Sequence, residues 1–520
     1  MRKRFALTAL AALLAAVLFL SGIGFAEQRK QPITSLDKLA QPGVRIAVGI
    51  DTPAERSLRN DYPQAEILIY NDIFLAYLDV AKGRIDACVA ARREMEFAMQ
   101  NGLTGVRLLE ENYDNNRIAI GISPVTPIPD LKKKLDTFIA ERKADGTLDE
   151  MFERWALRGE EKMPEIPAAE NPTFRLRVGT TGTVMPYSYY SGTTLVGYDI
   201  ELAYRFAAWL GAEPELLTYD FGGIIAAAEG GRVDCIMSNL FYSEEKEEAI
   251  RFSDILFEVP ITAMVKDDSN QSLLSGIGAS FEKTFLKEDR WKLFLDGIVT
   301  TLVMTVLSVL FGTLLGFLGF MACRRGNRAA TAISRFCTWL VDGMPTVVLL
   351  MVLYYIVFGA AHLSGVAVAV IGFTLIFGSA VFKLIGVGVG AVESGQYEGA
   401  WALGCSDRKT FFRIVLPQAL PHVMPAYRQR IATLIKATAI VGYIAVQDLT
   451  KMGDIVRSRT YEALFPLIAV TVIYFLIEGL FAFLVGRISI NMDPKRRRPK
   501  RILRGIQVQE SLGGESGNDS

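Results

Sequence analysis

Residues that could catalyse a reaction or hold a metal ion are few and scattered in this sequence. The two histidines, at positions 362 and 422, lie far apart. The five cysteines, at positions 88, 235, 323, 337 and 405, show neither metal-ligand nor redox spacing, so we interpret them as small apolar fillers, with a Cys88–Cys235 disulfide as the alternative. The phosphate-binding pattern Gly-x-x-x-x-Gly-Lys-Ser/Thr does not occur. The chain is therefore predicted not to be an enzyme and to hold no metal or cofactor.

Six residues between positions 398 and 417 have a spacing that suits binding to a partner protein. A glutamate, an alanine two residues later and a glycine four residues after that are followed, ten residues on, by Ile-x-Leu-Pro. The glycine is predicted to make a tight turn between two short helices, and the proline to end the second helix because it lacks an amide donor. An amphipathic hairpin that contacts no partner is the alternative. The six residues are Glu398, Ala400, Gly404, Ile414, Leu416 and Pro417.

This spacing resembles the EAA loop of ATP-binding-cassette importer permeases, a cytoplasmic helix-turn-helix that docks into a cleft of a separate ATPase subunit. The resemblance implies that ATP and Mg²⁺ are bound by that partner chain, since no phosphate-binding loop occurs here. Two permease subunits normally line one path, so the resemblance also implies a permease homodimer with two ATPases.

Hydrophobic segments surround this loop and predict an all-α membrane part. Residues 298–323 carry no charge and are long enough for one crossing, and the uncharged residues 343–382 predict two more, joined by a turn at residues 359–365. Residues 431–446 and 463–485 are the fourth and fifth candidates. Lys+Arg and Asp+Glu are equal at 56 each, which argues against a nucleic-acid partner.

The basic residues predict the orientation of these crossings, because cytoplasmic loops hold an excess of lysine and arginine. Residues 324–328 and 495–501 are strongly basic, and both are expected inside together with the EAA-like loop, which requires five crossings. Residues 1–26 have a basic start, an apolar core and a small-residue end, as in a secretory signal peptide. We therefore expect a multi-pass protein of the plasma (inner) membrane, with the following segment extracytoplasmic and the C-terminus cytoplasmic.

The permease resemblance extends over residues 294–488 and is similar to the polar amino-acid (histidine/glutamine-type) family. Asp342-Gly-Met-Pro345 stands where that family shows Arg-Gly-Thr-Pro, and the family's Glu and Arg in the third crossing are here Lys383 and Gly386. We expect the Lys383 ammonium to reach the membrane interface along its flexible stem. Glu478, in the last crossing, is expected either to line the path or to pack between helices.

Two segments ahead of the membrane part resemble the lobes of type II solute-binding proteins. The later one, residues 174–260, looks like the start of such a protein, with Pro186-Tyr187, a Val-Gly-Tyr-Asp-Ile-Glu-Leu run at 196–202 and Asp234-Cys-Ile. The earlier one, residues 35–157, looks like its second half, with Gly83-Arg-Ile-Asp86-Ala. The halves are swapped, and the proline-rich residues 163–172 would join the old ends, since such permutations are tolerated.

The predicted fold is thus a two-lobed α/β periplasmic-binding-protein-like (Venus flytrap) domain followed by an all-α, five-helix transmembrane type I permease domain. A strand at 175–178 before a helix at 198–210 predicts parallel sheets, and two hinge strands are expected near residues 117–122 and 260–265. The predicted divisions are a signal peptide (1–26), lobe 2 (27–163), a linker (164–172), lobe 1 (173–267), a linker (268–293), the permease (294–490, EAA loop 395–421) and a basic, disordered tail (491–520).

The solute pocket implied by this resemblance is altered at its main positions. The family's Thr and carboxylate-binding Arg correspond to Ser243 and Lys246, its ammonium-binding Asp to Ala91, and its aromatic before the proline to Val184. Lysine can neutralise a carboxylate but lacks the planar fork of arginine. Capping or loop hydrogen bonds are the alternative role for the polar candidates. The predicted ligand-binding residues are Thr52, Tyr187, Phe221, Ser238, Asn239, Ser243 and Lys246.

The function that these resemblances imply is that of the membrane subunit of an ATP-binding-cassette importer with a fused extracytoplasmic binding domain. Its solute would be an amino acid or related small polar molecule, with a non-amino-acid organic anion as an alternative. A clam-shell ligand-gated ion channel is the alternative from another class. Val441-Gly442-Tyr443 looks like part of a potassium filter, but residue 444 is Ile where that filter needs Gly.

Overall fold

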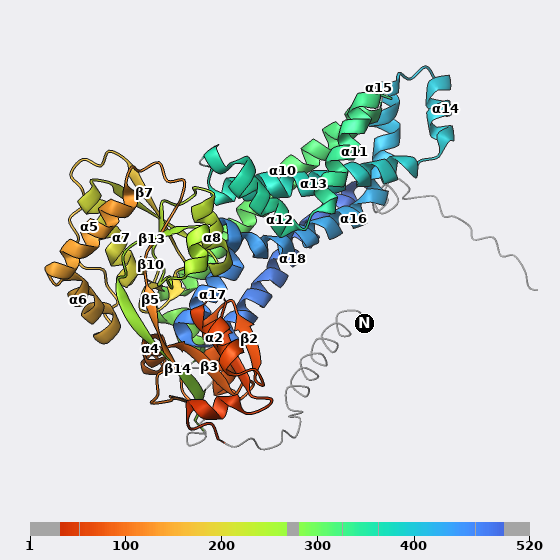
Figure 1. Ribbon diagram of the computed structural model, residues 1–520. Helices are drawn as coiled ribbons and strands as arrows, with labels where there is room; N and C mark the ends of the chain where they lie inside the picture. Colours follow the sequence, from red (N-terminus) through yellow and green to blue (C-terminus); the bar gives the residue numbers. More distant parts are fainter. Residues whose placement is uncertain are drawn as a thin grey trace, which may run out of the picture.

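The computed structural model describes residues 32–50, 52–267, 280–324, 326–361, 363–462 and 464–492. The signal peptide at 1–26 and nearly all of the tail at 491–520 lie outside the described residues, as does the first part of the 268–293 linker, residues 268–279. Figure 1 shows two parts, a sheet-containing part and a set of long helices that extends away from it. The sheet-containing part holds two lobes, here named A and B.

Lobe A is built on a mixed sheet in the order β2-β1-β3-β14-β4, with β5 pairing the other end of β14. β1 runs parallel to β2 and β3, whereas β14 is antiparallel to β3. The strands are β1 (Arg45–Gly49), β2 (Glu66–Tyr70), β3 (Ala87–Ala91), β4 (Val106–Leu108), β5 (Asp114–Ile118) and β14 (Phe257–Lys266). The helices of this lobe are η1 (Leu36–Ala40), α2 (Pro53–Asp61), α3 (Ile73–Ala81) and α4 (Arg92–Gln100).

Lobe B is built on a second sheet in the order β11-β7-β12-β6-β13, with a small sheet β10-β9-β8 beside it. β7 is parallel to β11 and β12, and the predicted strand at 175–178 and helix at 198–210 are confirmed as β7 and α7. The strands are β6 (Gly121–Ile122), β7 (Arg175–Thr180), β8 (Thr183–Val184), β9 (Ser188–Ser191), β10 (Thr194–Val196), β11 (Glu213–Thr218), β12 (Cys235–Ile236) and β13 (Arg251–Phe252). The helices are α5 (Leu131–Ala144), α6 (Thr147–Phe152), η2 (Glu153–Leu157), α7 (Tyr198–Leu210), α8 (Phe221–Glu229) and η3 (Glu244–Glu248).

Two chain segments cross between the lobes, the first at the predicted hinge near 117–122 and the second at 253–256, just before the predicted hinge strand at 260–265. The chain passes from β5 in lobe A to β6 in lobe B, and later from β13 in lobe B to β14 in lobe A. The predicted lobe boundaries at 27–163 and 173–267 are therefore wrong in detail. Residues 121–157 join lobe B, where the rings of Phe138 and Phe206 lie 5.2 Å apart, and residues 257–266 join lobe A.

A buried ion pair shows why residues 131–157 belong to lobe B. Arg154 Nη1 donates to Glu201 Oε1 at 2.6 Å, and the indole of Trp155 donates to Glu201 Oε2 at 2.7 Å. Glu201 lies on α7 and is fully buried. Because an unpaired buried carboxylate is very costly, this contact ties the end of the earlier segment to the start of the later one. The predicted joint at 163–172 therefore connects two segments that this contact already holds together.

Three helices of the second part are long and apolar enough to cross a membrane, namely α10, α13 and α18. Two further candidates are bent pairs, with a bend of 111° between α11 and α12–η6 and one of 60° between the helix ending at Ile444 and α17. The helices are η4 (Glu282–Leu286), η5 (Lys287–Asp289), α10 (Trp291–Arg324), α11 (Arg328–Gly343), α12 (Thr346–Met351), η6 (Val352–Val357), η7 (Gly359–Ala361), α13 (Gly365–Gly390), α14 (Ser394–Ala402), α15 (Asp407–Thr410), η8 (Phe411–Val415), α16 (Leu416–Ala437), η9 (Thr438–Ile444), α17 (Leu449–Thr460) and α18 (Leu464–Met492).

Glycines allow α10 and α13 to pack backbone against backbone. A Cβ atom on Gly316 would lie 2.5 Å from the carbonyl oxygen of Gly378, and one on Gly312 would lie 2.9 Å from the Phe377 side chain. Small residues at such a crossing bring the two helix axes close, which favours dispersion contacts and weak backbone hydrogen bonds between helices in lipid. This pair forms the centre of the helical part.

The segment around Gly404 forms the predicted helical hairpin, at the end of the helical part far from the lobes (Figure 1). Gly404 has a φ of 74°, and its amide donates to the Trp401 carbonyl at 2.9 Å, which closes the turn after α14. The predicted stop at Pro417 is wrong, because α15, η8 and α16 continue as one helix from Asp407 to Ala437. Pro417 lies in the interior of this helix, directly after the π-helical turn Phe411–Val415, whose wider hydrogen-bond spacing accommodates a residue without an amide donor.

Candidate functional site

A cavity of about 710 Å³ lies between the two lobes and is bordered by the helical part. Lobe A contributes the ends of β1 and β3 with the starts of α2, α3 and α4. Lobe B contributes residues after β7 and β12 and the start of α8, while α17 closes the third side. Strand ends and helix starts thus converge here, which is where open α/β sheets bind small ligands.

Four of the seven predicted ligand-binding residues line this cavity, namely Thr52, Phe221, Ser238 and Asn239. Two of them also make local hydrogen bonds. The Thr52 hydroxyl donates to the Gly49 carbonyl at 2.8 Å, and Ser238 Oγ accepts from the Thr181 amide at 3.2 Å. Ala91 and Val184, the two altered family positions, line the cavity as well.

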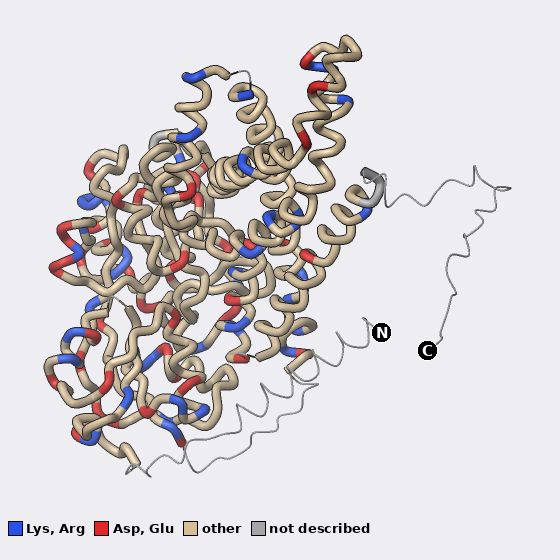
Figure 2. The backbone as a smooth tube through the Cα atoms, turned by 90° about the vertical axis from the view of Figure 1, so that its right-hand side faces the viewer, with Lys and Arg blue, Asp and Glu red and all other residues tan. Residues whose placement is uncertain are grey.

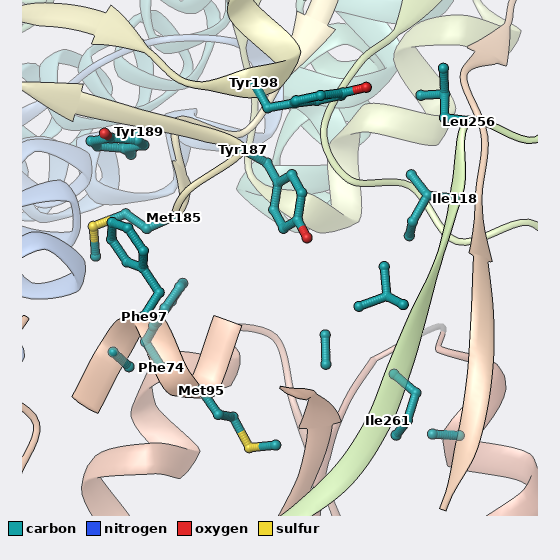
Figure 3. Close-up of a cluster of buried hydrophobic side chains, with 14 of the residues drawn as sticks. Phe74, Met95, Phe97, Ile118, Met185, Tyr187, Tyr189, Tyr198, Leu256 and Ile261 are labelled. Carbon is teal, nitrogen blue, oxygen red and sulfur yellow. The ribbon is translucent and has the colours of Figure 1, made fainter. Parts of the chain in front are cut away.

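The other three predicted residues are not among the described residues that line the cavity. Tyr187 is fully buried beside Tyr198 (Figure 3). Its ring also stacks on that of Phe257, with 6.0 Å between the ring centroids. Ser243 precedes η3, and Lys246 lies half-buried within it. The position expected to bind a carboxylate is therefore outside the cavity wall.

Glu94 is a cavity residue that the sequence analysis missed. It lies on α4 three residues after Ala91, so one helical turn brings a carboxyl group to the wall that the altered position leaves apolar. The Asn239 amide of lobe B donates to Glu94 of lobe A, and the Asn239 backbone amide donates to Asp199 at 2.6 Å. Burial, and then the charge of Asp199, raises the pKa of Glu94 to about 8, and burial raises the pKa of Asp199 to about 7.

Two buried amide groups in the cavity wall keep an atom without a partner. Asn239 Oδ1 and Asn116 Nδ2 have no hydrogen-bond partner, although the two residues are only 5% and 4% exposed. Burying an unsatisfied polar atom costs free energy, so both atoms favour a bound molecule that supplies a donor to one and an acceptor to the other. This is the strongest sign in the cavity that it holds a polar solute.

Helix α17 connects both lobes to the helical part through charged side chains. Lys451 Nζ lies 2.6 Å from Asp220 Oδ1 in lobe B, and Arg457 Nη2 lies 3.4 Å from Asp72 Oδ2 in lobe A. The same Arg457 nitrogen lies 2.8 Å from Asp454. In the sequence these residues fall between the fourth and fifth predicted crossings, and nothing local to them signals that they meet residues more than 200 positions earlier.

Lobe B is also joined directly to the helices after α11. The Arg232 guanidinium donates to the carbonyls of Tyr354, at 2.9 Å from Nε, and Phe358, at 2.8 Å from Nη2. The Tyr355 hydroxyl donates to the carbonyls of Gly223 at 3.1 Å and Tyr443 at 2.6 Å. The Val441-Gly442-Tyr443 segment is thus packed against α8 of lobe B, which is an arrangement unlike that of an ion-selective filter.

The six residues of the predicted coupling segment lie on and beside the hairpin. Ala400 is buried, Ile414 and Leu416 are half-buried, and Glu398, Gly404 and Pro417 are exposed. Two apolar side chains at the turn are also exposed, with Trp401 at 52% and Leu403 at 84%. Charged residues of both signs lie on the lobes and also on this hairpin (Figure 2), where Asp407, Arg408 and Lys409 are exposed. The hairpin therefore offers a mixed surface of exposed apolar and charged side chains.

Two charged residues flagged in the crossings have partners within the helical part. Lys383 pairs with Asp342, which also accepts a hydrogen bond from the Ser379 hydroxyl at 3.0 Å. Lys436 Nζ lies 3.4 Å from Glu478 Oε2. All five cysteines are free, so the alternative Cys88–Cys235 disulfide does not form.

Comparison with known proteins shows both parts. Residues 176–440 match the family of bacterial extracellular solute-binding proteins, family 3. A putative glutamine transport system permease protein of Rickettsia bellii (strain RML369-C) is 31% identical over 194 residues, which cover 36% of this chain and 88% of that relative. An arginine transport system permease protein of Bacillus subtilis (strain 168) is 31% identical over 195 residues, with the same two coverages of 36% and 88%.

Among solved structures, a crystal structure of an amino acid ABC transporter with histidines matches at 26% identity and a TM-score of 0.36, covering 38% of this chain and 94% of that one. The family match spans half of the chain, and the permease relatives are covered over most of their length. The chain therefore belongs to family 3 of the bacterial extracellular solute-binding proteins and, in the same polypeptide, to the permeases of ATP-binding-cassette importers.

Proposed function

We propose that this chain imports an amino acid or a related small polar solute, which the cavity between the lobes selects and the helical part conducts. The observation that carries the proposal is the pair of buried, unpartnered atoms, Asn239 Oδ1 and Asn116 Nδ2, in a cavity of about 710 Å³. A solute with an amino and a carboxyl group supplies the donor and the acceptor that these atoms lack. The permease relatives named for glutamine, arginine and L-cystine transport support an amino-acid solute.

The lobes would act as a clam-shell whose halves occur in swapped order along the chain. Lobe B, with residues 131–157 packed onto it, corresponds to the first lobe of a solute-binding protein and lobe A to the second. The two crossing segments, β5–β6 and β13–β14, support this arrangement because they are the only strand connections between the two sheets among the described residues. Asn239 of lobe B already donates to Glu94 of lobe A beside the cavity, so opening about these segments would separate the two residues and admit the solute.

The helical part would cross the plasma (inner) membrane five times, with both lobes outside and the C-terminus in the cytoplasm. Three straight crossings and two bent pairs support this number. The basic residues 324–328 and the α14–α15 hairpin then lie on the cytoplasmic side, as the distribution of lysine and arginine favours.

Energy would come from a separate ATPase that carries ATP and Mg²⁺ and binds the α14–α15 hairpin of each subunit in a permease homodimer. The exposed Trp401 and Leu403 support a partner surface on this hairpin. Solute binding would favour the closed lobes, and because α17 contacts both lobes, lobe closure would bias the helices toward the state that closes the ATPases on ATP.

The proposal is tested with the full chain in detergent micelles and in proteoliposomes. Thermal unfolding is measured with each of the twenty proteinogenic amino acids, and uptake of the stabilising ones is measured after reconstitution with the ATPase that co-purifies with the chain. We expect at least one amino acid to raise Tm and to be taken up in an ATP-dependent manner. The absence of any shift across the panel would overturn the amino-acid assignment.

A further inference from the structure

The charged groups in the cavity wall are unequal in number. Among the described lining residues four are acidic and two are basic. Lobe A supplies two of the acids, lobe B one and α17 the fourth, while both bases come from α17. The acids are Asp72, Glu94, Asp220 and Asp454, and the bases are Lys451 and Arg457.

At the α17 end, two cations meet three carboxylates. Lys451 is 6% exposed and is taken by Asp220, 2.6 Å away. Arg457 is shared, since one of its nitrogens lies 2.8 Å from Asp454 and 3.4 Å from Asp72. Among the described lining residues, one negative charge at this end is therefore left without a matching cation. The Asp72, Asp220 and Asp454 side chains are 25%, 36% and 38% exposed, so they are partly withdrawn from solvent but remain open to a ligand in the cavity.

The opposite end of the cavity offers acceptors. The Asn239 side-chain amide donates to Glu94, and its Oδ1 atom accepts no hydrogen bond. This oxygen can therefore accept a hydrogen bond from a donor on a bound molecule. Glu94 itself is a carboxyl group in direct contact with that amide. Of the described lining residues at this end, none carries a positive charge, and Asn116 Nδ2 is the one unpartnered donor. The cavity thus holds places for several donors and for one acceptor.

We propose that the solute of this importer carries a net positive charge and that α17 of the permease domain completes its binding site with Asp454. The proposal rests on the proposed function and names its solute class as cationic amino acids. The solute's amino and carboxyl groups satisfy the asparagine atoms, and its additional positive charge balances the excess carboxylate. The solute is then held by three bodies, lobe A, lobe B and the permease helix, so its binding is sensed directly by the membrane domain.

Two pairs of probes differ in charge but little in shape: L-arginine against L-citrulline, and L-lysine against L-norleucine. Their affinities for the full chain in detergent micelles are measured by isothermal titration calorimetry at pH 7. We expect each cationic member to bind about tenfold more tightly, or better, than its neutral counterpart, the size typical of one added close charge pair. The Asp454→Asn variant is expected to lose most of this ratio while keeping its affinity for citrulline.

Glu462→Gln is the matched control, because Glu462 follows α17, bonds to the Ser280 hydroxyl and is not a lining residue of the cavity. Its arginine-to-citrulline ratio should equal that of the unaltered chain. If citrulline or L-glutamate binds as tightly as arginine, the cationic solute class is wrong while the amino-acid function stands. An unchanged ratio in Asp454→Asn would overturn the role of α17. If none of the probes binds and the wider amino-acid panel also fails, it is the proposed function that has failed.

Discussion

Glu94 and Asp199 form a buried carboxyl pair that connects the lobes through one asparagine. Each carboxyl group accepts a hydrogen bond from Asn239, Glu94 from the side chain and Asp199 from the backbone. Burial raises the pKa of both acids, so the folded arrangement that buries them is most stable while these groups are protonated. The same contact forms one wall of the solute cavity, which links solute binding to lobe closure.

The pH dependence of stability follows from the sign of this shift. Because the pKa of Glu94 is raised from 4.5 to about 8 on folding, its contribution is fully present below about pH 4.5 and is lost as pH rises toward 8. Glu94→Gln keeps the hydrogen bond without the charge. We expect the variant to be more stable than the unaltered chain at pH 8.5 by about 1 kcal/mol or more, or roughly 2 °C in Tm, and to differ less at pH 5.

The control for this prediction lies on the same helix. Glu96 pairs with Arg93 at 2.9 Å on the half-exposed face of α4. Glu96→Gln should leave the pH profile of Tm unchanged, because such surface pairs contribute little. A Glu94→Gln profile parallel to that of the unaltered chain would contradict the assignment of the raised pKa to this residue.

At the scale of elements, the turn between α14 and α15 depends on one glycine. Gly404 has a φ of 74°, while a Cβ atom there would contact nothing within 4 Å. Gly404→Ala is therefore expected to strain only the turn, by about 1 kcal/mol. We expect the chain to fold and to bind solute normally but to retain less ATPase on co-purification, since the hairpin no longer presents its docking surface in one conformation.

Gly399→Ala is the matched variant for this hairpin. Gly399 lies within α14, also has open space around it, and has no positive φ. Alanine there favours the helix, so ATPase co-purification should be unchanged. An equal loss of co-purifying ATPase in the two variants would mean that any methyl group added to this surface blocks the partner. The loss would then not be caused by strain in the turn.

The Asp342–Lys383 pair shows how two departures from the importer pattern compensate each other. Asp342 stands where the resembling family has Arg, and Lys383 stands where it has Glu, so both charges are reversed and the two side chains meet. The Lys383 ammonium therefore pairs with Asp342. The sequence analysis expected only that this ammonium would reach the membrane interface.

Reversing the pair provides a test of this compensation. Lys383→Glu alone places two carboxylates together, and we expect uptake in proteoliposomes to fall about tenfold, because like charges in contact cost more than 1 kcal/mol. The double variant Asp342→Arg with Lys383→Glu should recover most of the uptake. A double variant as inactive as the single one would show that the pair does not act as a unit.

At the scale of the whole molecule, lobe B and the membrane helices are joined by the buried Arg232. Its guanidinium bonds to carbonyls that end the Thr346–Val357 helix and lies 4.0 Å above the Tyr354 ring. Lobe B therefore moves with this helix, whereas lobe A reaches the helical part through Arg457 on α17. Closing the lobes requires the two contacts to move relative to each other, which is how the binding domain would drive the helices.

Arg232→Ala should separate solute binding from transport. We expect solute affinity to stay within about twofold, since Arg232 is not a lining residue of the cavity, while uptake falls about tenfold or more through the loss of several charge-assisted bonds. Arg175→Ala on the same lobe, where the pair with Glu213 is more than half exposed, is the control and should leave both unchanged. Equal losses of affinity and uptake on Arg232→Ala would point to unfolding of lobe B.

Local chemistry was sufficient for much of this architecture. The turn at Gly404, the apolar helices, the strand before α7 and the two crossing segments follow from turn residues, hydrophobic runs and alternation, all of which act over a few residues. Pro417 shows the limit of such rules, because whether a proline ends a helix depends on the hydrogen-bonding geometry of the helical turn that precedes it.

Through its resemblances, the sequence by itself therefore indicated the two classes of domain, the helical hairpin at Gly404 and four residues of the cavity wall. Only the tertiary structure decided that Glu94 places a carboxyl group in the cavity wall near Ala91, that Lys246 lies outside the cavity, that Lys383 meets Asp342 and that α17 forms the third wall. The Lys383–Asp342 and Arg457–Asp72 contacts join residues 41 and 385 positions apart, and such pairings are set by how whole elements pack, which no local pattern encodes.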